Sequence, residues 1–362
     1  MRFMRFPFSV YVCALCLAGP ASGQPADSPA LRAEMVAVAV QLLESVAGED
    51  ESARERAERL GLGRSDGMAF AAGDPERTNW QFWPTQRIGL PLWLMSKEQR
   101  RLTHELLRAV MSSSGYLKTV QIMQLDELMA SIDEVGNLVS MDHYRLAIFG
   151  EPSIDSVWGW RFEGHHISLN VSVGADRIIV TPTFLGANPA EVQMGLLAGL
   201  RVHGAVEDMA RELVESLDEN ERRIAVVSEQ APADILTSQQ DLARDEWSAW
   251  LEAVQPEGIA VAELNEVQQH WVRRIVAEVV SNYRDELAEP IADRIDIERM
   301  SFAWMGSTAR GRPHYFRLQD ADFMFEYDNA ANDGNHVHSV WRSKSSDFGG
   351  RALLDHYRAA AH

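Results

Sequence analysis

The sequence has only two cysteines, Cys13 and Cys16, and both lie within its first 23 residues. Those residues have the features of a secretory signal, with two arginines before a mostly apolar run and a small-residue cleavage site. We therefore expect cleavage near Gly23 and export to the periplasm or the medium. The exported chain then has no disulfide, no thiolate nucleophile and no cysteine ligand for a metal.

Long hydrophobic runs and an excess of positive charge are also lacking. No segment after the leader reaches the roughly 18 apolar residues of a membrane span, so we expect no stable membrane anchor. The 362 residues include 34 Lys and Arg against 53 Asp and Glu, a net charge of −19 that becomes −21 when the two leader arginines are removed. A chain this acidic repels nucleic acid, and we expect no nucleic-acid partner.

Several motifs of well-known enzyme classes are absent as well. The sequence has no Walker loop, no dinucleotide-binding glycine fingerprint and no His-Glu-x-x-His helix. Nucleotide-dependent and flavin-type functions are therefore without support. Any metal site must be built from histidine and carboxylate side chains, with Met, Tyr or Asn as further candidates.

The chain does contain two histidine pairs in segments that resemble β-strands. In residues 335–341, His336 and His338 fall on the same face, because side chains alternate with period two along a strand. A hairpin with the preceding strand that places Asp328 opposite His336 brings Glu326 opposite His338. Two imidazoles and two carboxylates on one face can bind a divalent metal or hold a proton.

The second pair, His165 and His166, lies beside Glu163 in another strand-like run. Adjacent strand residues face opposite ways, so only one of the two histidines can join the same metal site in regular geometry. We assign His165 as the third metal ligand, since it shares a face with Glu163, and keep His166 as a catalytic candidate. A β-bulge at Gly164 would reverse that choice. Glu326 or Glu163 then serves as a further ligand or as the general base.

Arginines and tryptophans are candidates for substrate binding. Arg87, Arg161 and Arg342 can each clamp a carboxylate or phosphate with two hydrogen bonds, and Trp160 can contact a sugar or an aromatic ring. The plainer alternative is that each arginine pairs with one of the many acidic side chains and that the tryptophans belong to the core. The tryptophans that would form a ligand-binding groove are Trp80, Trp83, Trp158, Trp160 and Trp341.

Strand and helix patterns occur in separate blocks along the chain. Hairpin patterns near residues 144–183 and 302–341 are separated by helical patterns, which favours an α+β fold with one antiparallel sheet packed with several α-helices. We expect both strand regions to join in that sheet and to bring the two histidine pairs together. Ser96 to Gln99 has the form of a helix capping box, and Asn188-Pro189 predicts another helix start.

Several runs together resemble one bacterial family, the domain-of-unknown-function family numbered 3500. The similarity extends over nearly the whole exported chain, so we expect residues 24–362 to form a single family-length domain. The family has no assigned function, so the resemblance implies no particular reaction. The runs that carry it are Trp158–Asn170, Pro182–Ala190, Phe325–Asn329 and Asn335–Arg342.

We therefore predict an exported metal-dependent enzyme in which His336, His338 and His165 hold one divalent ion, Zn, Cu or Fe. Such an ion lowers the pKa of a bound water to about 7, which suits hydrolysis of a small or oligomeric substrate. Copper or iron on the same histidines would instead make an oxidoreductase, but no sequence feature demands a redox metal. Two alternatives stay open: a non-catalytic periplasmic protein that binds a small ligand in an aromatic groove, and metal-free acid–base catalysis.

Overall fold

The computed structural model of the chain describes residues 28–47, 67–132, 140–174, 177–238, 251 and 253–350. The expected signal, residues 1–23, lies outside this range. Within the range the α+β prediction is confirmed, since one large sheet packs against several helices. None of the helices in the described part of the chain is long and apolar enough to cross a membrane.

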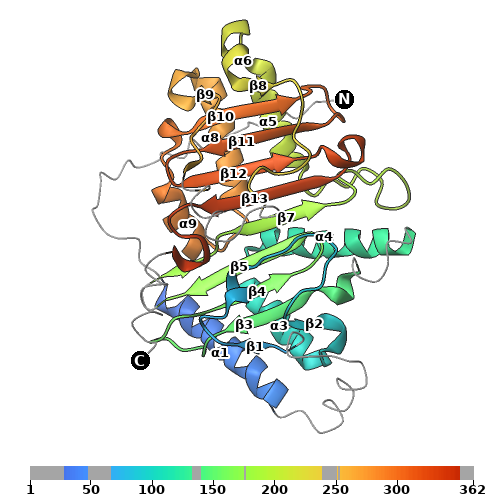
Figure 1. Cartoon of the computed structure of the whole chain (residues 1–362), viewed down its shortest axis with the longest axis vertical. Helices are drawn as coiled ribbons and strands as arrows, with labels where there is room; N and C mark the ends of the chain where they lie inside the picture. The colour runs from blue at the N-terminus through green and yellow to red at the C-terminus, as the bar shows by residue number, and fades with distance from the viewer. Residues whose placement is uncertain are drawn as a thin grey trace, which may run out of the picture.

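Thirteen strands form one sheet (Figure 1). Neighbouring strands are antiparallel, except for the first with the third and the eighth with the tenth, which are parallel. The strands are β1 Ala69–Phe70, β2 Leu90–Pro91, β3 Arg145–Phe149, β4 Trp158–Glu163, β5 Ile167–Val173, β6 Ile178–Ile179, β7 Thr183–Ala187, β8 Val226–Ser228, β9 Ile259–Ala260, β10 Ser301–Gly306, β11 His314–Gln319, β12 Phe323–Asp328 and β13 Val337–Ser343.

The sheet is assembled from two groups of strands that are far apart in the sequence. Its main path runs β1-β3-β4-β5-β7-β13-β12-β11-β10-β8, with β2, β6 and β9 attached at β3, β5 and β10. The groups meet where β7 pairs with β13, and there Gly186 lies opposite His338. This pairing confirms the expectation that both strand regions contribute to one sheet.

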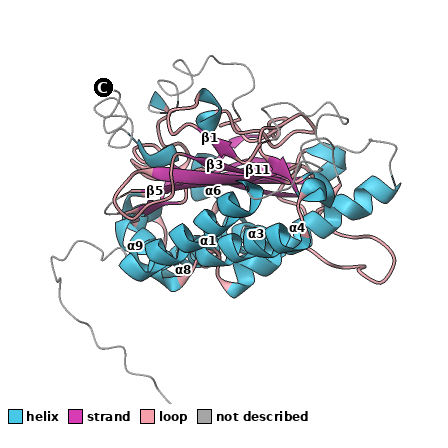
Figure 2. Cartoon of the chain, turned by 90° about the horizontal axis from the view of Figure 1, so that it is seen from below, coloured by secondary structure: helices cyan, strands magenta, loops and turns pink. Residues whose placement is uncertain are grey.

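Seven α-helices are described, and Figure 2 shows most of them packed on one face of the sheet. The predicted capping box is confirmed at the start of the second: Ser96 Oγ accepts from the Gln99 N–H at 3.2 Å, and the Gln99 side chain accepts from the Ser96 N–H at 2.8 Å. The helices are α1 Pro29–Ala47, α3 Lys97–Val110, α4 Ser113–Ile132, α5 Gly204–Ser216, α6 Glu219–Ala225, α8 Glu266–Val280 and α9 Asp285–Arg294.

The two faces of the sheet are covered differently. Ile167 and Leu169 of β5 belong to the main core, which includes the helices, as the alternation of apolar residues predicts. On the opposite face, where Figure 2 shows mainly loops and short turns, Phe184 and Val340 belong to a second, smaller core. The loop residues of this second core are Trp80, Phe82 and Ile235.

The prediction that a helix begins at Asn188 is wrong. A loop leads from this residue to α5, which begins only at Gly204. The backbone N–H groups of Ala190 and Glu191 donate to the backbone and side-chain oxygens of Asn335, at 2.9 and 2.8 Å. A contact with a distant segment therefore outweighs the local helix-start signal.

One buried histidine outside the candidate site affects how stability depends on pH. The ring of His314 stacks on Trp304, with centroids 4.7 Å apart, and on Tyr327, 5.5 Å away. Its Nδ1 lies 3.0 Å from the backbone oxygen of Arg312. Burial lowers the pKa of His314 to about 4, so the ring is neutral in the folded protein at pH 7.

We predict that the variant His314→Phe loses less stability on acidification than the parent protein does. An unfolded histidine, with a pKa near 6.5, gains a proton as the pH falls, whereas folded His314 stays neutral until about pH 4. Unfolding therefore takes up a proton between these values, which costs the parent about 2 kcal/mol between pH 7 and pH 5. Phenylalanine keeps a stacking ring but cannot titrate.

Urea unfolding of parent and variant at both pH values measures this difference. The exposed His270 on α8 provides the matched control, His270→Phe, which should leave the pH dependence unchanged. If the free energy of unfolding fell equally between pH 7 and pH 5 in the parent and in His314→Phe, the prediction that His314 causes the loss would be contradicted.

Candidate metal centre

Four histidines gather at the edge of the sheet where β5 and β13 begin and β7 ends. His165 and His166 occupy the turn between β4 and β5. His336 directly precedes β13, and His338 is the second residue of β13. The backbone N–H of Gly186 donates to the carbonyl of His166 at 2.8 Å, which ties the turn to β7. A Cβ at position 186 would come within 2.8 Å of the His166 ring, so this close approach requires glycine.

Three of these histidines point nitrogen atoms toward one another. The Nε2 atoms of His166 and His336 are 2.8 Å apart, and one ring nitrogen from each of His166, His336 and His338 lies within 4.8 Å of the others. Zn–N bonds of about 2.0–2.1 Å in a tetrahedral site place ligand nitrogens about 3.4 Å apart. The three imidazoles are thus positioned to hold one metal ion after small movements.

Two carboxylates, the fully buried Asp126 and the half-buried Asp234, orient two of the three rings. Asp126 Oδ1 lies 2.6 Å from His166 Nδ1, and Asp234 Oδ1 lies 2.7 Å from His338 Nδ1. An ionised carboxylate can only accept a hydrogen bond, so Nδ1 of each ring carries the proton. The lone pair is then on Nε2, and this carboxylate–histidine arrangement is typical of metal sites.

Asp126 is a buried charge with a full set of hydrogen-bond partners. Tyr144 Oη donates to its Oδ2 at 2.5 Å, and His165 Nδ1 lies 3.2 Å from the Oδ1 that also contacts His166. Burial raises the pKa of the Asp126 carboxyl, but His166 and His165 outweigh burial and hold this pKa well below its usual range. Burial, with the charge of Asp126, raises the pKa of Tyr144, which stays a donor.

His166 and His336 are in the protonation state that binds metals. Burial lowers the pKa of His166 to about 4, and burial together with His166 and His338 lowers the pKa of His336 well below its ordinary value. Both rings are therefore neutral at pH 7 and need not release a proton from a charged form when a metal binds. His166 is fully buried, whereas His336 is half-buried and gives the cluster access to solvent.

A second group of candidate ligands shares His166 with the first. Asp126, His165 and His166 also place one ligand atom each within 4.8 Å of one another. In this group the contacting atoms are Nδ1 and Oδ1, which already hydrogen-bond to one another. The structure thus brings both predicted histidine pairs together. His166 lies beside His336 and His338, whereas the sequence favoured His165 for that position.

The register of the predicted hairpin is wrong by two residues. Asp328 lies opposite His338, and Glu326 lies opposite Val340, so each acid pairs two positions further along β13 than expected. The cause is the connection between β12 and β13, in which the turn Ala331–Gly334 makes the loop longer than the sequence pattern indicates.

Glu326 holds a loop and belongs to neither candidate ligand group in the described residues. Its fully buried carboxylate accepts hydrogen bonds from the backbone N–H groups of Leu236, at 2.7 Å, and Thr237, at 3.2 Å. The hydroxyl of Tyr315 donates to it at 2.8 Å. Because this loop also carries Asp234, Glu326 lies beneath the loop that approaches the candidate metal centre and not among the grouped ligand atoms.

Glu163 and Arg161 anchor another loop on the same face. Glu163 Oε1 accepts from the Gln81 N–H at 2.5 Å, and its Oε2 lies 3.2 Å from Arg161 Nε. Arg161 also donates to the carbonyl of Glu76 at 2.8 Å. Glu163 too is outside both ligand groups of the described residues, and its carboxylate contacts Gln81 and Arg161.

The other proposed substrate-binding residues are buried as well. Arg87 donates to the carbonyls of Gln81 and Thr85, at 3.2 and 3.0 Å. Arg342 is fully buried and donates to Asp347 at 3.1 Å, and Trp160 is only 1% exposed within the main core. The structure thus places Arg87, Arg161, Arg342 and Trp160 in packed, buried positions, as in the plainer alternative stated for the arginines and tryptophans.

The expected aromatic groove is largely core. Trp80, Trp158, Trp160 and Trp341 are each at most 3% exposed. Trp83 is half-buried, and its ring lies edge-on to His338 with centroids 5.7 Å apart. One tryptophan of the five therefore borders the histidine cluster, which does not make an aromatic binding groove.

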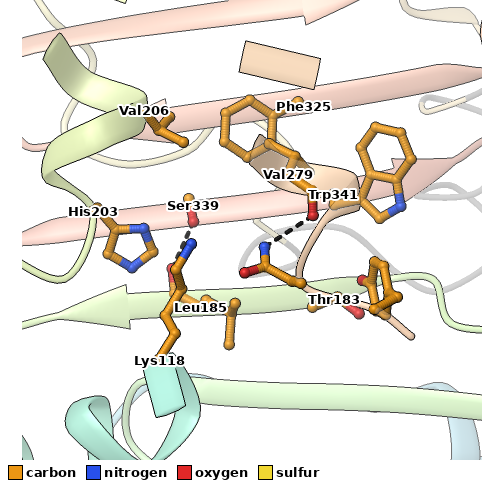
Figure 3. A pocket seen from close by; sticks show the side chains of 11 residues that line it. Lys118, Thr183, Leu185, His203, Val206, Val279, Phe325, Ser339 and Trp341 are labelled. Carbon is orange, nitrogen blue, oxygen red and sulfur yellow. Dashed lines mark hydrogen bonds between the residues drawn. The ribbon is translucent and has the colours of Figure 1, made fainter. Parts of the chain in front are cut away.

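A small hollow lies between the sheet and helices α4, α5 and α8, apart from the metal centre. Figure 3 shows His203, Lys118 and Ser339 among the side chains that line it. Ser339 follows His338 on β13, so its side chain faces the opposite side of the sheet. The volume of about 20 Å³ has room for about one water molecule. This hollow is too small for an organic substrate.

Sequence reasoning missed both orienting carboxylates. Asp126 follows buried Ile122 by one helical turn and is itself fully buried, so the available signal was a charge within the apolar face of a helix. Asp234 lies in an irregular segment and has no comparable signal. Its role depends on the position of the loop beside His338.

The fold and the site define a class of protein: an α+β chain whose sheet edge carries a candidate metal centre of histidines braced by buried carboxylates. The model of the family described as protein of unknown function (DUF3500) matches residues 44–350, and the chain belongs to this family. The resemblance noted in the sequence is thereby confirmed. No curated protein and no solved structure matches the chain.

We predict that Asp234→Asn and Asp126→Asn each weaken zinc binding by about 10–100-fold, because loss of a charged acceptor frees the ring it orients. Competition with a chromophoric zinc chelator at pH 7 measures the change. Asp142→Asn, at an exposed acid outside the cluster, is the control and should bind zinc like the parent. Unchanged affinity in both test variants would contradict the orienting role.

A separate prediction concerns Glu326. Replacement by Gln should lower the free energy of unfolding by about 1.5–3 kcal/mol, because hydrogen bonds to a buried charge are lost. At saturating zinc the folded variant should still bind as much metal as the parent. Complete loss of zinc from a folded Glu326→Gln protein would instead assign Glu326 as a ligand.

Proposed function

We propose that this chain is an exported metal-dependent hydrolase whose single zinc ion is held by His166, His336 and His338. The observation that carries the proposal is the convergence of three imidazoles, two of which have Nδ1 within hydrogen-bond distance of a carboxylate. Three histidine ligands with a remaining position open to solvent are typical of catalytic zinc sites. The signal-like first 23 residues support export.

We propose zinc because hydrolysis requires no change in the oxidation state of the metal. The bound ion would lower the pKa of a water molecule to about 7 and so supply a nucleophile near neutral pH. The candidate ligands are three imidazoles, without the thiolate or thioether that selects a redox copper site. Copper or iron on the same residues would make the protein an oxidoreductase.

His165 is the proposed general base, so it exchanges roles with His166 relative to the expectation from strand alternation. Asp126 accepts from Nδ1 of His165, which leaves Nε2 of this ring free to take a proton. The His165 ring centroid lies 3.8 Å from that of His166, close to the proposed ion. Asp126 therefore orients both the base and a ligand.

We also propose that residues 24–362 act as one domain. In support, β7 and β13 join strands from both halves of the chain in one sheet. The metal centre takes His166 from one half and His336 and His338 from the other. Neither half alone contains the complete ligand set.

Elemental analysis of untagged protein from its native compartment tests the metal assignment. We expect about one equivalent of zinc in the parent and none in a folded His336→Ala, His338→Ala variant, because one ring cannot hold the ion. His270→Ala is the control and should keep the metal. Copper or iron in the parent would overturn hydrolysis in favour of oxidation, and a metal-free parent that cannot be reloaded would overturn the metal centre.

The hydrolytic step is tested with p-nitrophenyl acetate, an activated ester that needs no specific binding pocket. We expect the zinc form to cleave it, a chelator to abolish cleavage and added zinc to restore it. His165→Asn should reduce kcat by about 100-fold, the usual contribution of a general base, without loss of zinc. Cleavage that survives chelation would point to metal-free acid–base catalysis.

A further inference from the structure

A larger hollow, of about 260 Å³, lies against the residues that precede β13. It lies between the loop after β7, the start of α5, the β10–β11 loop and the residues just before β13. Asn335 lines it and directly precedes His336. Figure 1 shows the loop after β7 projecting from the edge of the sheet at which β13 begins. The hollow and the histidine cluster therefore occupy the same edge.

The charges at the base of the hollow neutralise one another. Glu207 is buried and pairs with Arg201 and Arg211, each at 2.8 Å. Arg201 also forms two hydrogen bonds with Asp208, at 2.7 and 2.8 Å. This network fixes the floor of the hollow and leaves ligand recognition to its rim.

The rim carries charges of both signs that are available to a ligand. The Arg310 side chain is 61% exposed, and it approaches no closer than 4.0 Å to Asp208, whose carboxylate is already held by Arg201. Among the described residues, the half-buried Glu191 carboxylate forms no ion pair, although its backbone N–H is bound to Asn335. Asp333 is 83% exposed and lies 3.9 Å from its nearest arginine.

We propose that this hollow binds a zwitterionic ligand, a short peptide with free termini. Arg310 would receive the carboxylate, and Glu191 with Asp333 would receive the ammonium group. A volume of about 260 Å³ is at the lower end of small-ligand pockets, which favours a dipeptide over a longer chain. One cation and two anions at the rim disfavour ligands that carry only negative charge.

The catalytic part of this assignment rests on the proposed hydrolase function, whereas the binding part does not. Hydrolysis of the dipeptide would consume one water: the amide C–N bond breaks, a C–O bond forms at the carbonyl carbon, and a water proton ends on the released amine. His165 would carry that proton from water to amine. Asn335 lines the hollow and directly precedes His336, so it connects the proposed dipeptide site to the metal centre along the chain.

Isothermal titration calorimetry with L-alanyl-L-alanine tests the binding part. We expect a Kd of about 1 mM or tighter for the free dipeptide. N-acetyl-alanyl-alanine and alanyl-alaninamide, each lacking one terminal charge, should bind at least tenfold more weakly. Equal binding of the capped peptides, or binding of the neutral disaccharide maltose but not of the dipeptide, would overturn the proposal.

Variants assign the residues and separate binding from catalysis. Glu191→Gln and Arg310→Gln should each weaken dipeptide binding at least fivefold, whereas Arg299→Gln, at an exposed arginine outside the hollow, should not. The His336→Ala, His338→Ala variant should still bind the dipeptide. Binding without release of alanine by the zinc form supports the hollow as the ligand site and contradicts the hydrolase. Unaltered binding in both rim variants contradicts the hollow.

Discussion

The antiparallel pairing of β7 with β13 is the constraint on which the rest of the structure depends. It joins strands from the two halves of the chain and places Gly186 opposite His338. The same strand end holds the carbonyl of His166 through the Gly186 N–H. His166 and His336 are thereby brought within 2.8 Å although 170 residues separate them in the sequence. Every ligand distance in the candidate centre follows from this one strand junction.

Buried carboxylates serve two different purposes around this junction. Asp126 and Asp234 orient imidazole rings, whereas Glu163 and Glu326 hold loops against the face of the sheet that lacks helices. A charge removed from water is costly unless several donors compensate it, and each of these carboxylates receives at least two hydrogen bonds or ion pairs. The loop over β12 that carries Asp234 depends on Glu326, so the two purposes are coupled.

The acidic character of the chain suits a cationic cofactor. The net charge is −19, and two carboxylates, Asp126 and Asp234, back the candidate ligands. A divalent ion would therefore be attracted to this site, because neither carboxylate pairs with an arginine or lysine among the described residues. The neutral state of His166 and His336 follows from burial, which disfavours a charged ring more strongly than the neighbouring carboxylate favours it.

The sequence by itself determined the α+β class, the family and the two histidine pairs, because strand alternation, capping residues and local runs are properties of neighbouring residues. It did not determine the register of β12 against β13, which depends on a longer turn, or the choice of His166 over His165. Nor could it reveal Asp234, whose position depends on a loop fixed by Glu326. Only the tertiary structure decided these points, because each arises from contacts between segments that are distant along the chain.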